Sequence, residues 1–177
     1  WDQGLARFTE RVYRELFGEK LAQMVGGETL ANLARQGKLQ SFLQSQMFEG
    51  KPLAGSLGGW LAKAAPFQGK QIICYHKDLA YFEARFDVHC AEFVEAKPGI
   101  PPTPGHVARL IKLMKDQKIE VLVAAEHFGK DKVDAVATRA GARAVVFPMA
   151  PGTVAGVEDY FSLVDTWVTR LASAFRP

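Results

Sequence analysis

Apolar runs alternate with stretches of helical spacing from residue 70 onward, and this alternation constrains the fold more than any other feature. Parallel strands need long crossover connections, which are usually helices, so the alternation indicates βαβ units. The sequence therefore predicts an α/β fold in which a four-stranded parallel sheet is flanked by helices. The expected strands are Gln71–Tyr75, Val88–Val94, Glu120–Ala124 and Ala144–Phe147, and the expected helices are His76–Arg85, Pro104–Gln117, Asp131–Ala140 and about Glu158 to Ala174.

The preceding segment, residues 1–69, carries apolar residues at the three- and four-residue intervals of amphipathic helices. We expect residues 1–65 to contain helices only and the segment to pack as an appendage to an α/β domain that spans residues 70–177. Leu5, Phe8, Val12, Leu16 and Leu21 mark the first helix, which Gly26-Gly27 closes. Further helices are expected at Thr29–Gln36, at Leu39–Phe48 and between Pro52 and Pro66.

Composition excludes several classes of protein. The chain has 22 Lys and Arg against 19 Asp and Glu, and a net charge of +3 is too small to indicate nucleic-acid binding. No apolar run reaches the length of a membrane span. Cys74 and Cys90 form no CxxC pair, so buried free thiols are the expectation. Because Trp1 replaces an initiator methionine and no signal peptide is visible, we expect a processed or truncated product.

Polar groups follow the ends of the predicted strands. His76, Glu95, Glu126-His127 and Pro148-Met149 come directly after the four runs. Parallel strands end at one edge of their sheet, where open α/β folds bind ligands. His76 and Glu126 are therefore candidate ligands of a divalent cation. In the competing interpretation His76 is an ordinary interior histidine, Glu126 caps a helix and Glu95 faces solvent.

Other chemistry has little support in the sequence. There is no GxGxxG motif, Walker loop or GxSxG elbow, and Cys74 lies inside a strand, where a nucleophile would be poorly placed. His89 falls within the second strand and is expected to be packed or at an edge. His106 opens a helix and is expected to be solvated. The proline-rich loop from Glu95 to Gly105 is expected to be stiff and to shape the rim of the ligand edge, or to act only as a crossover.

These residues also suggest a family. The segment YHKDLAYFEARF resembles the Tyr/Ser-His-x-x-x-x-Tyr-Phe motif of the periplasmic receptors of zinc and manganese ABC importers, the ZnuA/TroA-like family. Further similar pieces follow in the same order, namely EAKPGIPPTPGHVARLIKLMK, VLVAAEHF, TRAGARAVVF and VEDYFSLVDTWVTRL. GKPLAGSLGGWLAKAAPFQGKQI resembles the linker region of one branch, so the likeness covers roughly residues 50–175.

The resemblance implies two α/β lobes joined by a long helix, with the metal held between them. His76 falls on the position of the histidine (or glutamate) that the C-terminal lobe contributes. Glu126 falls on an acidic position that is not usually a direct ligand. The family's aspartate after the last strand is replaced by Pro148, and the first lobe with its two histidines has no counterpart here. We therefore expect the C-terminal lobe and linker of a receptor, which alone binds the metal weakly.

The leading hypothesis is a solute-binding component of an ABC importer that captures zinc, or alternatively manganese, without catalysis. It would deliver the cation to a membrane permease, from the periplasm or from a lipid anchor outside the cytoplasmic membrane. An isolated lobe could cover its apolar helical surface by pairing with a second copy. The alternatives are an interaction or structural domain without a working metal site and an enzyme of flavodoxin-like architecture.

Overall fold

The computed structural model describes residues 2–95, 97 and 99–175. The chain divides into two compact units, Trp1–Lys63 and Ala64–Pro177. The division falls slightly earlier than the predicted boundary between residues 69 and 70.

The second unit is built on a sheet of four strands, β3 (Lys70–Cys74), β4 (Val88–Phe93), β5 (Val121–Ala125) and β6 (Arg143–Phe147), in the order β4-β3-β5-β6. All neighbouring pairs are parallel, which confirms the predicted fold class. Every residue of β5 is buried, as expected for a strand covered on both faces. The chain runs outward from β3 to β4 and then returns to β5 on the other side of β3.

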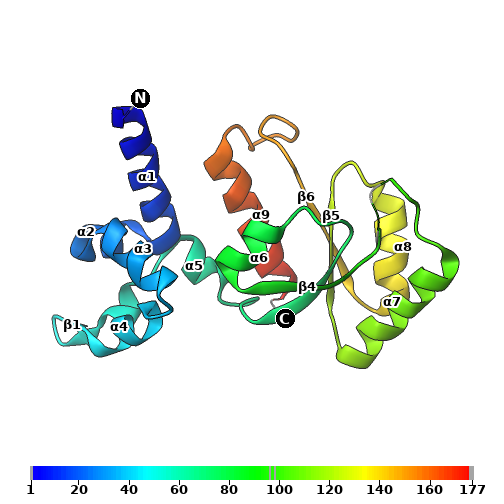
Figure 1. The fold of residues 1–177 in the computed structure, drawn as a ribbon, viewed down its shortest axis with the longest axis horizontal. Helices are drawn as coiled ribbons and strands as arrows, with labels where there is room; N and C mark the ends of the chain where they lie inside the picture. Colours follow the sequence, from blue (N-terminus) through cyan, green and yellow to red (C-terminus); the bar gives the residue numbers. More distant parts are fainter. Residues whose placement is uncertain (1, 96, 98, 176–177) are drawn as a thin grey trace. The chain divides into compact units, whose positions relative to one another are not determined.

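Helices cover both faces of this sheet. Figure 1 shows α6 and α9 on one side and α7 and α8 on the other. The α7–α8 side encloses a core that includes Ile73, Leu110, Met114, Leu122 and Val133. The helices are α6 (Ala80–Phe86), α7 (Pro104–Gln117), α8 (Lys130–Ala140) and α9 (Tyr160–Ala174).

Aromatic rings fill the α6–α9 side. Phe147 on β6 stacks with Trp167 on α9 at 5.4 Å between ring centroids and 6° between planes. Phe82 on α6 meets both rings edge-on, each at 5.8 Å. The Trp167 indole Nε1–H donates to the carbonyl of Pro148, 2.6 Å away. Trp167 therefore fixes the end of β6 and the start of the loop that follows it.

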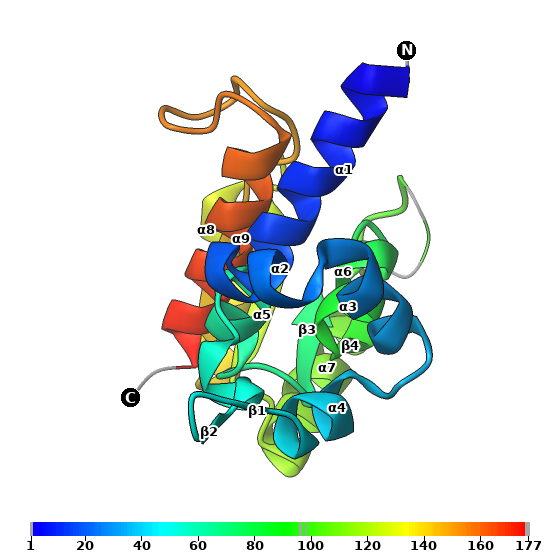
Figure 2. The same cartoon turned by 90° about the vertical axis from the view of Figure 1, so that its left-hand side faces the viewer.

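The first unit is mainly helical, but the prediction of helices only is wrong. A short antiparallel hairpin pairs Met47 with Pro52 and Phe48 with Lys51. Glu49 and Gly50, with φ of 48° and 76°, form the turn, and positive φ at both central positions is typical of tight hairpin turns. Figure 2 shows this hairpin beside α4. The elements are α1 (Asp2–Phe17), α2 (Glu19–Val25), α3 (Gly27–Arg35), α4 (Leu39–Ser45), β1 (Met47–Phe48), β2 (Lys51–Pro52), a 3-10 turn (Leu53–Ser56) and α5 (Gly59–Ala64).

Gly18 interrupts the helix that was expected to continue to Gly26. Its φ of 85° is a conformation that residues with a Cβ rarely adopt. A Cβ here would also lie 2.8 Å from the Cα of Gly58, so the two backbones approach closely at this point. The Gly58 N–H donates to the Phe17 carbonyl across the same contact, at 2.9 Å. The break therefore lets the segment before α5 pack directly on the end of α1.

Candidate metal site

The site lies where the direction of the chain changes between β3 and β5. In open α/β sheets the crevice at such a switch point, beyond the carboxyl ends of the strands, is the usual place for a ligand. The Tyr75 N–H donates to the Val123 carbonyl at 2.7 Å, and the Glu95 N–H donates to the Tyr75 carbonyl at 2.8 Å. The backbone is therefore held on both sides as far as Tyr75, and His76 is the first residue beyond this support.

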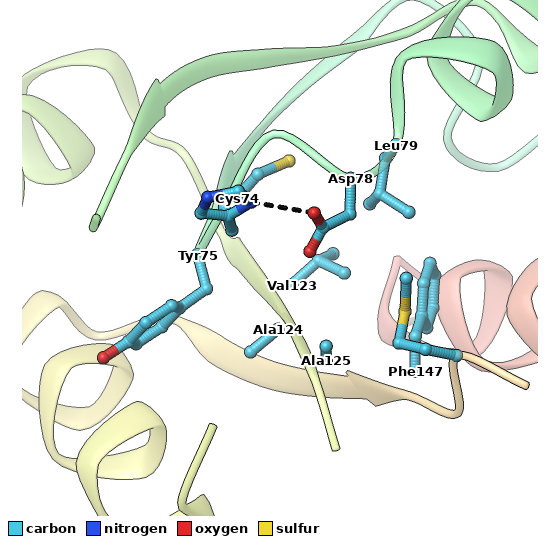
Figure 3. Close-up of a pocket in the computed structure, with 10 residues that line it drawn as sticks. Cys74, Tyr75, Asp78, Leu79, Val123, Ala124, Ala125 and Phe147 are labelled. Atoms are coloured by element: carbon cyan, nitrogen blue, oxygen red, sulfur yellow. Dashed lines mark hydrogen bonds and ion pairs between the residues drawn. The ribbon is translucent and has the colours of Figure 1, made fainter. Parts of the chain in front are cut away.

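His76 is oriented by Asp78. The imidazole Nδ1 lies 2.8 Å from the Asp78 carboxylate, and the two side chains are 22% and 30% exposed. Figure 3 marks this bond with a dashed line and shows Tyr75 pointing the other way. Because an ionised carboxylate only accepts hydrogen bonds, Nδ1 carries the proton. The lone pair of the neutral ring is then on Nε2, the nitrogen available to a metal.

The helix after β3 begins later than predicted. The helical pattern predicted a start at His76, whereas α6 begins at Ala80. Residues 75–77 form a bend instead, and the Asp78 side chain that follows turns back to the His76 ring. His76 therefore lies on a loop between β3 and α6 and not in the first turn of a helix.

The ends of all four strands contribute to one open hollow. Of the groups predicted to converge on this edge, the structure brings four together, and it adds Asp78 and Phe128, which sequence reasoning missed. The only signal for Asp78 was its position two residues after the histidine. The hollow is lined by His76, Asp78, Glu95, Gly99, His127, Phe128 and Met149. A smaller pocket, drawn in Figure 3, shares His76, Asp78 and Met149 with it and reaches down to Cys74 and Val123.

Glu126 is not among the residues that line either cavity. Its backbone N–H donates to the Phe147 carbonyl at 3.0 Å, and its carboxylate accepts from the Met149 N–H at 3.4 Å. These contacts join the loops that follow β5 and β6. A role for Glu126 as a ligand or as a partner of His76 stays a prediction.

Of the rings near this edge, His127 and Phe128 line the hollow, and Tyr75 packs against Phe128. Tyr75 stacks on Phe128 at 4.2 Å between centroids, and His127 packs against the same ring at 4.2 Å. Burial, and secondarily the negative charge of Glu95, raises the pKa of the Tyr75 hydroxyl. Tyr75 therefore stays neutral at physiological pH and provides a stacking surface beside the polar groups.

The part of the chain that the structure describes contains no cluster of three or more His, Cys, Asp or Glu side chains suited to a metal ion. A closed structural zinc site has four protein ligands. Among the described residues the hollow therefore holds no closed zinc site, and His76 is the histidine there whose ring contacts a carboxylate.

His89 and His106 do not line the hollow and contact other parts of the fold. His89 is exposed on β4, and its Nε2 lies 3.3 Å from the Asp87 carboxylate. His106 was expected to be solvated, but its Nε2 donates to the Phe93 carbonyl at 2.8 Å and the ring is half-buried. Thr103 caps the helix that His106 enters, accepting from the His106 N–H at 3.2 Å. His106 therefore attaches α7 to the end of β4.

The expectation of free thiols is wrong. Cys74 and Cys90 form a disulfide that joins neighbouring strands, with their Cα atoms 5.5 Å apart. The sequence could not reveal the pairing, because it depends on which strands lie side by side and in what register.

Among the residues that the structure describes, no helix combines the length and apolarity needed to cross a bilayer.

Several solved structures share this fold, although their sequences are only distantly similar. The crystal structure of ZnuA is 19% identical, with a TM-score of 0.53, over 89% of this chain and 55% of that chain. FpvC from Pseudomonas aeruginosa in complex with Mn²⁺ is 17% identical, with a TM-score of 0.51, over 93% and 55%. The laminin-binding protein Lbp of Streptococcus pyogenes is 13% identical, with a TM-score of 0.51, over 85% and 52%. This chain therefore spans about half the length of the structures it matches.

No curated protein sequence matches the chain. The family described as "Zinc-uptake complex component A periplasmic" does match, over residues 59–174. This range contains the whole sheet, the His76–Asp78 pair and the hollow, and it exceeds half of the 177 residues. The resemblance predicted from the YHKDLAYFEARF segment is thus confirmed, and the chain belongs to the ZnuA family of periplasmic zinc-uptake components.

Proposed function

We propose that this chain is the C-terminal, cation-binding lobe of a solute-binding receptor for a metal ABC importer. It captures a divalent cation and passes it to a membrane permease without chemical conversion. The observation that carries the proposal is the His76–Asp78 pair, which lies at the switch point of the sheet and within the residues that the family matches. Domain 70–177 acts as the lobe, and residues 1–69 act as the linker region.

His76 Nε2 binds the cation in this proposal. Asp78 holds the ring in the correct tautomer and increases the basicity of Nε2, a role that carboxylates commonly have beside metal-binding histidines. Glu95, His127 and Met149 border the same hollow and are available to complete the shell as the cation settles. Glu126 was predicted as the neighbouring acid. In this proposal its carboxylate accepts the backbone N–H of Met149 and so holds Met149 in place.

Zinc is the proposed cargo, with manganese as the alternative. Structures of similar fold have been determined with zinc, Mn²⁺ and Ni²⁺ bound. Imidazole favours the later transition metals, whereas carboxylate oxygens favour manganese, and this hollow offers both. The proposed location is the periplasm or a lipid anchor outside the cytoplasmic membrane, and the Cys74–Cys90 disulfide fits such an oxidising compartment. Pairing with a second copy stays a prediction.

Titration of the metal-stripped chain by calorimetry tests the proposal. Zn²⁺, Mn²⁺ and Ni²⁺ are added separately, with Mg²⁺ as the control because it prefers an all-oxygen shell. We expect saturable binding of one transition-metal ion per chain and none of Mg²⁺. The absence of heat from all three transition metals, in protein shown to be folded, would refute the proposal. That result would favour the second candidate, an interaction domain that keeps the fold without a metal site, which the incomplete ligand cluster supports.

The Asp78→Asn variant should bind the transition metal more weakly, by about 10- to 100-fold, because the neutral amide polarises the imidazole less than the carboxylate does. Asp87→Asn is the matched control, since Asp87 makes a similar contact with His89 on the exposed surface of β4. Both dissociation constants are measured by calorimetry. Equal affinity in the parent chain and Asp78→Asn would show that Asp78 does not support the ligand.

A further inference from the structure

The Cys74–Cys90 disulfide lies directly beneath the proposed cation site. Cys74 is the last residue of β3, is 1% exposed and precedes His76 by two positions. It also lines the small pocket together with His76 and Asp78. The bond links residues 16 positions apart on two strands whose ends both border the hollow.

The strand that carries Cys90 is irregular at this point. Ile72 pairs with Cys90, but the next residue, Ile73, pairs with Glu92, so Ala91 is an extra residue in β4. Such a bulge bends the strand and redirects its neighbouring groups. The Cys90 N–H donates to the Glu83 carboxylate, 2.7 Å away. Since Glu83 belongs to α6, Cys90 is joined by its side chain to β3 and by its backbone to α6.

Both connections act on the same short loop. Residues 75–79 leave β3 directly after Cys74 and enter α6 at Ala80. The loop therefore begins at a residue bonded to Cys90 and runs into a helix that holds Cys90 through Glu83. It carries His76 and Asp78. A site binds more tightly when its ligands are already held in the bound geometry, because less conformational entropy is lost on binding.

We propose that the Cys74–Cys90 disulfide is a positioning element of the cation site. It holds the His76 loop so that Nε2 faces the hollow before the cation arrives. The oxidised chain is thus the high-affinity form, and the chain with the bond opened binds the transition metal more weakly. This inference rests on the proposed function, and it assigns to the disulfide a role in affinity that is separate from its role in overall stability.

The first test compares three forms of the chain by zinc calorimetry: the oxidised parent, the parent reduced with a phosphine, and Cys74→Ala/Cys90→Ala. The phosphine takes oxygen from water to become its oxide, and each sulfur of the opened disulfide gains a proton. A phosphine is used in place of a dithiol reagent because a dithiol reagent would chelate the metal. We expect zinc affinity to fall about 10-fold in both opened forms, the size of effect seen when supporting groups of a metal site are lost. Equal affinity in all three forms would overturn the proposal. Tighter binding by the reduced parent alone would also overturn it, because the thiols would then be ligands.

The second test needs no metal and separates positioning from general stability. Amide hydrogen exchange is followed in the oxidised parent and in Cys74→Ala/Cys90→Ala, under conditions where both are folded. We expect faster exchange at residues 76–79, with β5 and β6 unchanged. Uniformly faster exchange across the sheet, or no change at residues 76–79, would show that the bond only stabilises the fold. If the oxidised chain binds no transition metal, the proposed function fails, while this exchange result still decides whether the disulfide positions the loop.

Discussion

Replacing His76 by alanine is expected to abolish measurable zinc binding and to leave the fold almost unchanged. The ring is 22% exposed and lies outside the sheet, so its removal creates no cavity in the core. It is also the one histidine whose orientation is fixed at the hollow by a carboxylate. Because the coordination shell is incomplete, the remaining groups are not expected to hold zinc without it.

The control for His76→Ala is His89→Ala, which removes an exposed histidine that also faces a carboxylate. Calorimetry gives the zinc affinity of each variant, and thermal unfolding followed by circular dichroism gives its stability. We expect His89→Ala to bind zinc like the parent. Parent-like zinc binding by His76→Ala would place the site elsewhere in the chain.

The Trp167→Ala variant should lower the free energy of unfolding by about 3 kcal/mol, the lower end of the range for removing a large aromatic side chain from a packed site. The lower end applies because Trp167 is only half-buried. The change removes the stack on Phe147, the edge contact with Phe82 and the hydrogen bond to Pro148.

Trp167→Phe separates these contributions in part, since it keeps a six-membered aromatic ring and loses the indole donor together with the five-membered ring. We expect it to cost at least about 1 kcal/mol, the usual net value of one hydrogen bond, and less than Trp167→Ala. Urea unfolding followed by circular dichroism measures both variants. If alanine cost no more than phenylalanine, the ring stack would not stabilise the α6–α9 side of the sheet.

Strands β3, β5 and β6 could be predicted from the sequence because each contains at least three consecutive apolar residues. In β5 all five residues are buried, and the matching run of the sequence has no other reasonable interpretation. The helices α7 and α8 were predictable because residues at their ends favour the start or the end of a helix. Thr103 and Pro104 begin α7, and Gly141 ends α8 with a φ of 73°, a conformation that favours glycine.

The parts that could not be predicted depend on contacts between side chains or between distant segments. The delayed start of α6 accompanies a hydrogen bond between the His76 and Asp78 side chains, which the helical pattern of the sequence does not reveal. The hairpin at residues 47–52 consists of strands of two residues each, which are too short to show a period. The interruption at Gly18 becomes understandable only when the backbone of Gly58 is seen against it. For the site, the sequence indicated where the strands end. The contact between His76 and Asp78 could not be predicted, because it depends on how the two side chains are oriented in the folded loop.

The extra residue in β4 has a consequence for solubility as well. This strand stands at one end of the sheet, and a regular outer strand is a template on which other polypeptides can add by backbone pairing. At Ala91 the spacing of backbone donors and acceptors is broken, and the adjoining Glu92 is exposed and charged. An incoming strand would meet a mismatched ladder and a carboxylate at the same place. The irregularity next to Cys90 is therefore also expected to disfavour aggregation through this edge.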